Sequence, residues 1–285
     1  MKNEIRARKI LSLKQKEILL KKKLDHHYKY FDGSKISPDP LEFPHRYTNF
    51  YDAEISAFIS SVFAYGNVKQ IINSLEKIHE LMDNQPYRFV ADYSFENGMK
   101  LFRSIKHRFY TSEDIANLFF ALNHIYGNYG SLRYFFLLYY FEKDLNLKNA
   151  ISFFSQHFLE IISKKGRVTH GIKFMFPDPY KGSPRSGGRG GAGSACKRMN
   201  LFLRWMIRKD ELDLGLWTEI SPAKLLIPVD THVAKICKKL KLTKQKTVSW
   251  KMAEEITERL KRFDPTDPVK YDFAICHIGM RKLFF

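Results

Sequence analysis

Hydrophobic residues recur at steps of three and four along most of this chain, the spacing that places side chains on one face of an α-helix. The clearest example is the segment 52–64, which carries Ile55, Phe58, Ile59, Val62 and Phe63 in this spacing. Few segments alternate between apolar and polar residues with a period of two, as half-buried strands do. The sequence therefore predicts an all-α fold, and no internal repeat is evident.

Capping residues mark where several predicted helices begin. Asn67, Thr111 and Ser131 each precede an apolar periodic segment, and their side chains can accept hydrogen bonds from the first free backbone amides of a helix. Helices are predicted over 52–64, 68–81, 113 to beyond 122, 131–141, 149–162, 195–208, 230–240, 249–262 and 269–280.

A basic stretch at residues 1–30 and a segment rich in glycine and proline at 173–193 define the predicted domain organisation. Residues 1–30 form a basic, helix-like stretch, which is either a solvated arm or a helix packed on the body. Residues 31–285 are predicted to form one helical domain. Its internal boundary falls in 173–193, which holds three prolines and six glycines and from which no core is expected. This boundary predicts two lobes.

The charge of the chain points to a polyanionic partner. Its 48 Lys and Arg residues exceed its 30 acidic residues, which gives a formal net charge of +18. Such a surplus favours nucleic acid or an anionic membrane. No apolar run approaches the roughly 18 residues of a membrane span, and the most apolar run, 134–141, is too short. Nucleic acid is therefore the expected partner, and no membrane association is predicted.

Cysteine usage and the first residues indicate a cytoplasmic protein. Lysines and glutamates interrupt the first 25 residues, so no signal peptide is evident. Cys196, Cys237 and Cys276 lie 41 and 39 residues apart, a spacing that fits neither a zinc site nor a disulfide scaffold. Reduced thiols, no metal and no cofactor are expected.

Asp230 is the leading candidate for chemistry. It follows an apolar run and opens the helix predicted from 230, so its carboxylate can accept hydrogen bonds from free amides there. A carboxylate part-buried in this way can also activate water or stabilise a developing cation. From spacing alone, capping is the simpler interpretation of Asp230.

A glycine-rich turn precedes the helix predicted over 195–208. Backbone amides at such a turn can bind a phosphate, and neighbouring cations would add attraction. A flexible basic linker is the alternative interpretation. The predicted DNA-binding residues of this region are Arg189, Gly190, Gly191, Gly193, Ser194 and Arg198, with Ser194 as the helix N-cap.

Lys197 lies in the first turn of this helix, where the helix dipole slightly disfavours a cation. A neutral lysine can attack a sugar C1′ and form a Schiff base, whereas a charged one would pair with phosphate. Asn67 is a further candidate DNA contact, although plain capping explains it as well. Trp205, Trp217 and Trp250 are more typical of core residues than of base-stacking platforms.

Several of these segments resemble the helix-hairpin-helix DNA glycosylases. Pro228–Leu242, with Asp230-Thr231-His232, is similar to the segment of endonuclease III-like and adenine-mismatch glycosylases that holds their essential aspartate. Gly190–Asn200 resembles the hairpin and nucleophilic lysine, with Lys197 and Asn200 in the family's Lys-x-x-Asn run. The segments 52–75 and 271–279 are similar to its early helix pair and last core helix. The likeness is closest to a bacterial group of unknown function, over about 25–285.

The chain departs from the endonuclease III pattern in three places. Lys197 and Asp230 are 33 residues apart, a longer gap that implies an insertion at about 209–223. An archaeal branch acting on 8-oxoguanine is similar in having a long gap. Ser194-Ala195-Cys196 separates the last hairpin glycine from Lys197, which shifts the usual register. No four-cysteine motif follows the last helix, so no iron–sulfur cluster is expected.

The resemblance implies a DNA-repair enzyme that binds damaged double-stranded DNA and excises a flipped base, such as an oxidised purine. The sequence does not define the oligomeric state, and a monomer is favoured. With Lys197 as nucleophile it would be a glycosylase with abasic-site lyase activity, and with a water activated by Asp230 it would be a hydrolase alone. Two alternatives stay open. One is a non-catalytic protein of the same fold that binds DNA or recognises damage, and the other is an RNA-binding module that uses residues 1–30.

Overall fold

A computed structural model describes the backbone of residues 2–180 and 193–280, with side chains for 14–180 and 193–278. The described residues fold into helices and connecting turns without a β-strand, which confirms the predicted all-α class. Their only strand-like pairings are the isolated bridges His107–Tyr110 and Lys209–Leu214. Within these ranges, every helix is too short or too polar to traverse a bilayer.

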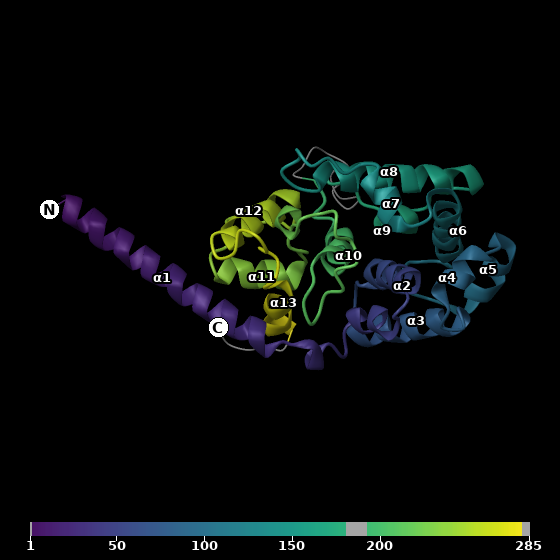
Figure 1. Ribbon diagram of the computed structural model, residues 1–285, viewed down its shortest axis with the longest axis horizontal. Coiled ribbons are helices and arrows are strands. Elements are labelled where there is room, and N and C mark those ends of the chain that lie inside the picture. Colours follow the sequence, from purple (N-terminus) through teal and green to yellow (C-terminus); the bar gives the residue numbers. More distant parts are fainter. Residues whose placement is uncertain (1, 181–192, 281–285) are drawn as a thin grey trace.

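The first part of the chain contributes the helices α1 to α9 (Figure 1). Most of the ends fall within a few residues of the predicted ones. The short helices α4, α5 and α9 were not predicted. The bounds are α1 Lys2–Tyr30, α2 Phe50–Phe63, α3 Val68–Leu81, α4 Pro86–Ala91, α5 Phe95–Leu101, α6 Ser112–Tyr129, α7 Leu132–Leu137, α8 Lys148–Lys165 and α9 His170–Met175.

The second part contributes α10 Lys197–Ile207, α11 Thr231–Lys239, α12 Trp250–Lys261 and α13 Asp272–Met280. Helices α2 to α9 gather on one side of the molecule, α11 to α13 on the other, and α10 lies between the two groups (Figure 1). Helix α10 packs against α2, and α11 packs against α13. The described residues bury their apolar side chains in one continuous cluster that spans both groups.

Helix α2 is the centre of the first group. Asn49 caps it by accepting hydrogen bonds from the backbone amides of Tyr51 and Asp52. Its residues from Ala53 to Phe63 are buried on every side, as expected for a helix without a polar face. The sequence predicted an apolar stripe here rather than complete burial, because periodicity alone does not show how many neighbours surround a helix.

One buried carboxylate connects α2 to its surroundings. Glu54 is fully buried and accepts hydrogen bonds from the Tyr126 hydroxyl at 2.5 Å, the Trp217 indole at 2.8 Å and the backbone amides of Leu132 and Arg133. Burial raises the pKa of Glu54, although these four donors act in the opposite direction. The contacts fix the start of α7 and the segment around Trp217 to α2. Trp205, Trp217 and Trp250 are all buried, which confirms their predicted place in the core.

The prediction that no core could be built from 173–193 is wrong for the part that the structure describes. Helix α9 extends to Met175, and both Met175 and Phe176 are buried. Phe176 stacks on Phe158 of α8 with ring centroids 4.2 Å apart. The prolines and glycines dominated the sequence pattern, whereas the apolar residues before them join the core.

Candidate active site

Lys197 and Asp230, the two predicted catalytic residues, meet in the structure. The Lys197 ammonium lies 3.3 Å from Oδ2 of Asp230. It also donates a hydrogen bond of 3.2 Å to the carbonyl oxygen of Ala64, at the end of α2. Both side chains are partly buried, with about a quarter of their surface exposed (29% for Lys197 and 25% for Asp230). Three helix ends therefore hold one amine and one carboxylate together.

The two oxygens of Asp230 have different partners. Oδ1 accepts hydrogen bonds from the backbone amides of His232 at 2.8 Å and Val233 at 2.9 Å, and so caps α11. Oδ2 faces Lys197. Burial raises the pKa of Asp230, but the charge of Lys197 and the hydrogen bond from Val233 outweigh it, so the pKa is lowered overall. Asp230 can therefore cap α11 through Oδ1 and act beside the Lys197 amine through Oδ2 at the same time.

The start of α10 differs from the prediction. Cys196 is the N-cap, in the left-handed conformation with φ of 44°, and Lys197 is the first helical residue. Ser194 was predicted as the cap, but its hydroxyl accepts a hydrogen bond from the Cys196 amide at 3.2 Å. The backbone turn at Cys196 thus replaces a side-chain cap, and helix α10 begins directly after it, at Lys197.

The backbone before α10 requires a glycine at position 193, because it has a positive φ and lies close to Pro179. Its φ is +62°, and a Cβ atom there would lie 1.7 Å from the carbonyl oxygen of Pro179. The carbonyl of Gly193 also accepts a hydrogen bond of 3.2 Å from the backbone amide of Trp250. Gly193 and Ser194 thus position α10. The structure shows no feature that assigns them to phosphate binding.

Lys197 and Asp230 line a cavity of about 540 Å³. Its walls come from the α2–α3 connection, one face of α10, the start of α11 and one face of α13. Lys197, Leu201 and Arg204 are one and two turns apart on α10, so Lys197 and Arg204 are separated by about 10 Å along the helix axis. The cavity therefore runs along α10, with the amine at one end of this row and Arg204 at the other.

The lining residues on α13 were not predicted as site residues. Asp272 bonds to the Arg204 guanidinium through Oδ2, whereas its buried Oδ1 has no hydrogen-bond partner among the described residues. Burial raises the pKa of Asp272 to about 6, despite the opposing charge of Arg204. The His277 ring stacks on Phe273 with centroids 4.0 Å apart. The only indication of this wall in the sequence was Asp272, an acidic residue at the start of an apolar helix.

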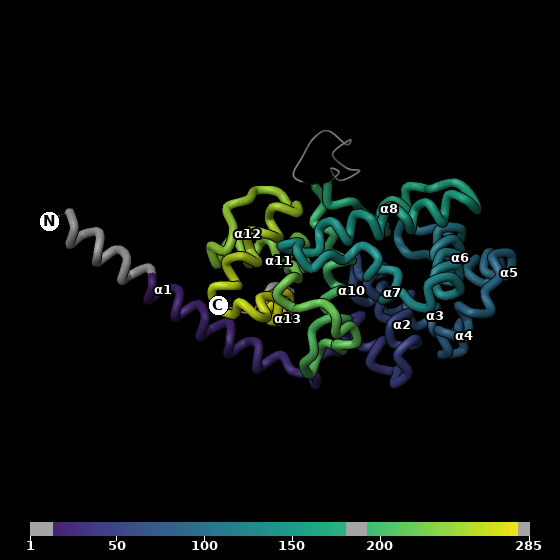
Figure 2. The backbone as a smooth tube through the Cα atoms, turned by 45° about the horizontal axis from the view of Figure 1, so that its top comes forward, coloured from purple at the N-terminus to yellow at the C-terminus, as the bar shows by residue number. Residues whose placement is uncertain are grey.

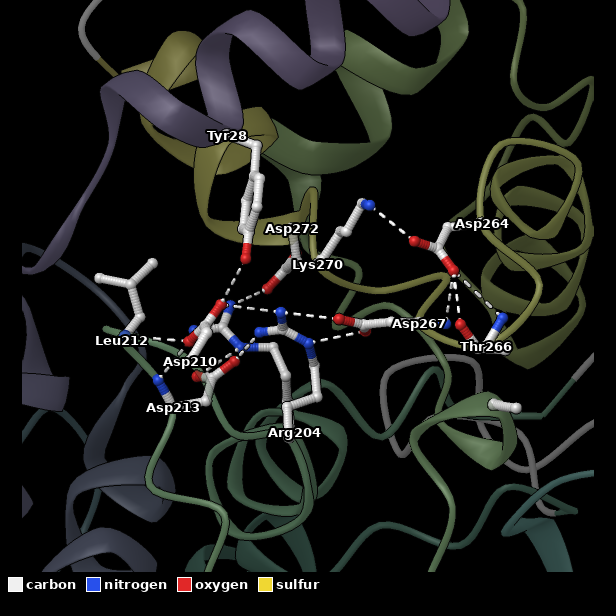
Figure 3. A network of polar contacts seen from close by, with 12 residues as sticks. Tyr28, Arg204, Asp210, Leu212, Asp213, Asp264, Thr266, Asp267, Lys270 and Asp272 are labelled. Atoms are coloured by element: carbon white, nitrogen blue, oxygen red, sulfur yellow. Dashed lines mark hydrogen bonds and ion pairs between the residues drawn. The ribbon is translucent and has the colours of Figure 1, made fainter.

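A buried ionic network supports the Arg204 end of the cavity (Figure 3). Asp213 bonds to both Arg204 and Arg208, and Arg208 also pairs with Asp210 and Asp267. The segment predicted as an insertion, about 209–223, supplies Asp210 and Asp213. This segment therefore connects α10 to the turn before α13.

The predicted DNA-binding residues fall into different environments. Asn67 is exposed, lines the cavity and caps α3 through a 3.0 Å hydrogen bond from the Lys69 amide.

The prediction that Arg198 contacts DNA is not supported by its placement. Arg198 is 8% exposed, and its guanidinium lies 3.8 Å from the centre of the Phe174 ring and bonds to the Phe174 carbonyl. Helical periodicity turned it inward, away from the face that holds Lys197. Arg189, Gly190 and Gly191 lie outside the described residues.

An aromatic group beside the cavity was also missed. Tyr65 lines the cavity and packs edge-on against Phe174, with ring centroids 5.0 Å apart. The Arg108 guanidinium lies 5.6 Å from the centre of the Tyr65 ring.

Across the described ranges, no set of three or more His, Cys, Asp or Glu side chains is arranged to hold a metal ion.

Comparison with known proteins gives one match. Neither the curated proteins nor the solved structures include a match to this chain. A family model described as "Protein of unknown function (DUF2400)" matches residues 39–281. The match covers all four walls of the cavity, together with Lys197 and Asp230. This chain therefore belongs to the DUF2400 family.

Proposed function

We propose that this protein is a DNA base-excision glycosylase with abasic-site lyase activity, built on a two-lobed helix-hairpin-helix glycosylase fold. The proximity of Lys197 and Asp230, 3.3 Å apart in a cavity of about 540 Å³, carries the proposal. The volume is within the range of about 300–1,000 Å³ that is usual for small-molecule sites. An extruded nucleobase with its sugar is a ligand of this class.

Lys197 supplies the nucleophile in this mechanism. Its ammonium first transfers a proton to the Asp230 carboxylate, which lies 3.3 Å away. The neutral amine then bonds to the sugar C1′ while the bond from C1′ to the base breaks. The base leaves with the bonding electrons and takes the proton that Asp230 accepted from Lys197, so the carboxylate is ionised again as the base departs. Breaking the bond between C1′ and the ring oxygen gives a Schiff base. Loss of a C2′ proton then expels the 3′ phosphate.

Asp230 has a second part in the reaction. The charge of Lys197 and the Val233 amide lower its pKa, so the carboxylate is ionised at neutral pH. A fixed negative charge beside C1′ stabilises the positive charge that develops there as the base departs. Its cap bonds to His232 and Val233 hold the carboxylate in place without reorganisation.

The lining of the cavity suits a flipped base. Leu201 and Phe273 offer apolar contact, and Asp272 and Arg204 offer polar groups at the end away from Lys197. Flipping is needed because a stacked duplex hides the glycosidic carbon, and it costs a few kcal/mol, less for a damaged base. The net charge of +18 supports a duplex as the carrier of that base.

The test is base release and strand cleavage on duplexes that carry oxidised purines, alkylated bases, uracil or an abasic site. We expect damage-dependent release and cleavage by the wild type, and a loss of at least about a thousandfold in Lys197→Gln. Lys235→Gln changes an exposed lysine of α11 and is the matched control. Unchanged activity in Lys197→Gln would overturn the assignment of the nucleophile. Binding without release or cleavage on any lesion would favour the non-catalytic alternative.

A further inference from the structure

Helix α1 stands out from the rest of the molecule in both views (Figures 1 and 2). It has 29 residues and is therefore about 43 Å long. It precedes residues 39–281, so the family match does not account for it. Over Lys2–Tyr30 the sequence carries ten Lys or Arg and three acidic residues. The helix is thus a long, strongly cationic projection.

The positive charge of its described half is not neutralised by the helix itself. Glu17 pairs with Arg262 of α12 at 2.8 Å, and Asp25 pairs with Lys21 at 2.7 Å. Both acidic side chains of this half are therefore already engaged. The exposed lysines have no ion pair among the residues whose side chains are described. They are Lys14, Lys16, Lys22, Lys23 and Lys29.

The base of α1 is attached to the wall of the cavity. Leu24 is buried, and the Tyr271 hydroxyl donates a 2.7 Å hydrogen bond to Asp25. Phe31, just after the helix, lies against Phe273 and His277 of α13, with ring centroids 6.3 Å and 5.4 Å away. Both of these residues line the cavity. The cationic helix thus starts at the cavity and leads away from it.

We propose that α1 is a second DNA-binding element, which contacts the phosphates of the duplex flanking the base held in the cavity. This inference rests on the proposed function, because it takes duplex DNA as the ligand. One turn of B-DNA is about 34–36 Å long, so α1 can follow more than one turn. Exposed lysines without an ion pair can contact phosphates without reading bases, and each contact contributes salt-dependent affinity.

The test uses the full-length protein with two matched triple variants. Lys16→Gln/Lys22→Gln/Lys23→Gln removes three charges from α1, and Gln preserves helix propensity. Lys100→Gln/Lys143→Gln/Lys164→Gln removes three exposed charges elsewhere on the surface. Binding is measured by fluorescence anisotropy as a function of salt, on duplexes of about 12 and about 30 base pairs, the longer of which exceeds two helical turns. Far-UV circular dichroism checks that helix content is unchanged.

We expect the α1 variant to bind the longer duplex roughly tenfold more weakly at low salt, with a salt slope smaller by between about 1 and 3. We expect the wild type to bind the longer duplex more tightly than the shorter one, and the α1 variant to lose this preference. Single-turnover base release at saturating DNA should stay as in the wild type. Equal losses in both triple variants, no loss in the α1 variant, or tighter binding of single-stranded RNA than of duplex would each overturn the inference.

The outcomes separate this inference from the proposed function. A wild type that does not bind duplex DNA contradicts both. A wild type that binds duplex through α1 but releases no base contradicts the glycosylase mechanism and leaves the role of α1 standing. An α1 variant that binds duplex as tightly as the wild type and releases bases equally well contradicts the role of α1 alone.

Discussion

The Lys197 ammonium lies 3.3 Å from the Asp230 carboxylate, although 33 positions separate the two residues in the chain. Each residue stands at the beginning of a helix, α10 for Lys197 and α11 for Asp230. The lysine is also held by the Ala64 carbonyl of α2. An amine and a carboxylate that share a cavity in this way are equipped for nucleophilic chemistry.

Substitutions of Asp230 can separate its role as the cap of α11 from its charge beside Lys197. Asp230→Asn should keep the cap of α11, because Asn is as good an N-cap as Asp, and stability should change by less than about 0.5 kcal/mol. Base release should fall by about 10²–10⁴, because the charge beside Lys197 is lost. Thermal unfolding and single-turnover kinetics measure the two effects. Asp230→Ala is the comparison, with an added loss of about 1 kcal/mol from the missing cap.

Full activity in Asp230→Asn would show that the carboxylate only caps α11. An equal loss of stability in the Asn and Ala variants would show instead that its charge, rather than its cap bonds to His232 and Val233, holds the helix in place.

Gly193→Ala tests how the start of α10 is positioned. The new Cβ would lie 1.7 Å from the Pro179 carbonyl oxygen in a backbone with φ of +62°. We expect destabilisation of more than about 1 kcal/mol, together with weaker base release as Lys197 shifts. Gly127→Ala is the control, because a Cβ there meets nothing within 4 Å and Ala favours the interior of α6. Chemical denaturation of both variants gives the comparison, and equal stability would contradict this account.

The buried network is expected to be sensitive to the loss of one partner. Asp213→Asn leaves Arg204 and Arg208, both 3% exposed, with less compensating charge. Removing one member of a buried ion pair costs about 3–5 kcal/mol. Glu258→Gln removes the exposed partner of Lys261 and should cost less than about 1 kcal/mol. Urea denaturation distinguishes the two, and a similar small cost in both variants would show that the network contributes little.

Two buried histidines should make the fold sensitive to mild acid. Burial lowers the pKa values of His79 and His107 to about 4, from 6.5. The unfolded chain therefore binds protons first, so the free energy of unfolding is greatest above pH 6.5 and falls as the pH drops towards 4. For each ring, the loss between pH 7 and pH 5 is about 2 kcal/mol.

His79→Gln tests this pH dependence. In the wild type, the His79 ring bonds to the Leu75 carbonyl at 2.8 Å and to the Ser56 hydroxyl at 2.9 Å. The variant should lose about 2 kcal/mol less than the wild type between pH 7 and pH 5, measured by urea denaturation at each pH. His26→Gln removes an exposed ring and serves as the control. A pH dependence identical to the wild type in His79→Gln would contradict the burial argument.

The strongest features of the fold could be predicted from local pattern. The helix predicted over 68–81 has the same bounds in the structure, because a cap at Asn67 and a clear apolar face both mark it. The aspartate at 230 was predicted as a cap for the same reason. Short helices such as α4 and α9 were missed, since six residues give too little periodicity to read.

The parts of the site that depend on tertiary contacts could not be predicted. Arg198 lies one residue after Lys197, yet it packs on Phe174 inside the fold, because the helix turns it about 100° away. Asp272 is an ordinary acidic residue in the sequence and becomes part of the cavity wall through its pairing with Arg204. These placements follow from which helices pack together, which local spacing does not encode.

Borohydride trapping tests the central claim most directly. A Schiff base between Lys197 and the sugar C1′ is reduced to a stable covalent bond, and peptide mass spectrometry locates it. We expect a damage-dependent adduct on the Lys197 peptide, which is absent in Lys197→Gln, reduced in Asp230→Asn and unchanged in Lys235→Gln. Base release without any adduct would move the chemistry to a water molecule. An adduct on another lysine, or neither adduct nor release across the lesion panel, would contradict the account.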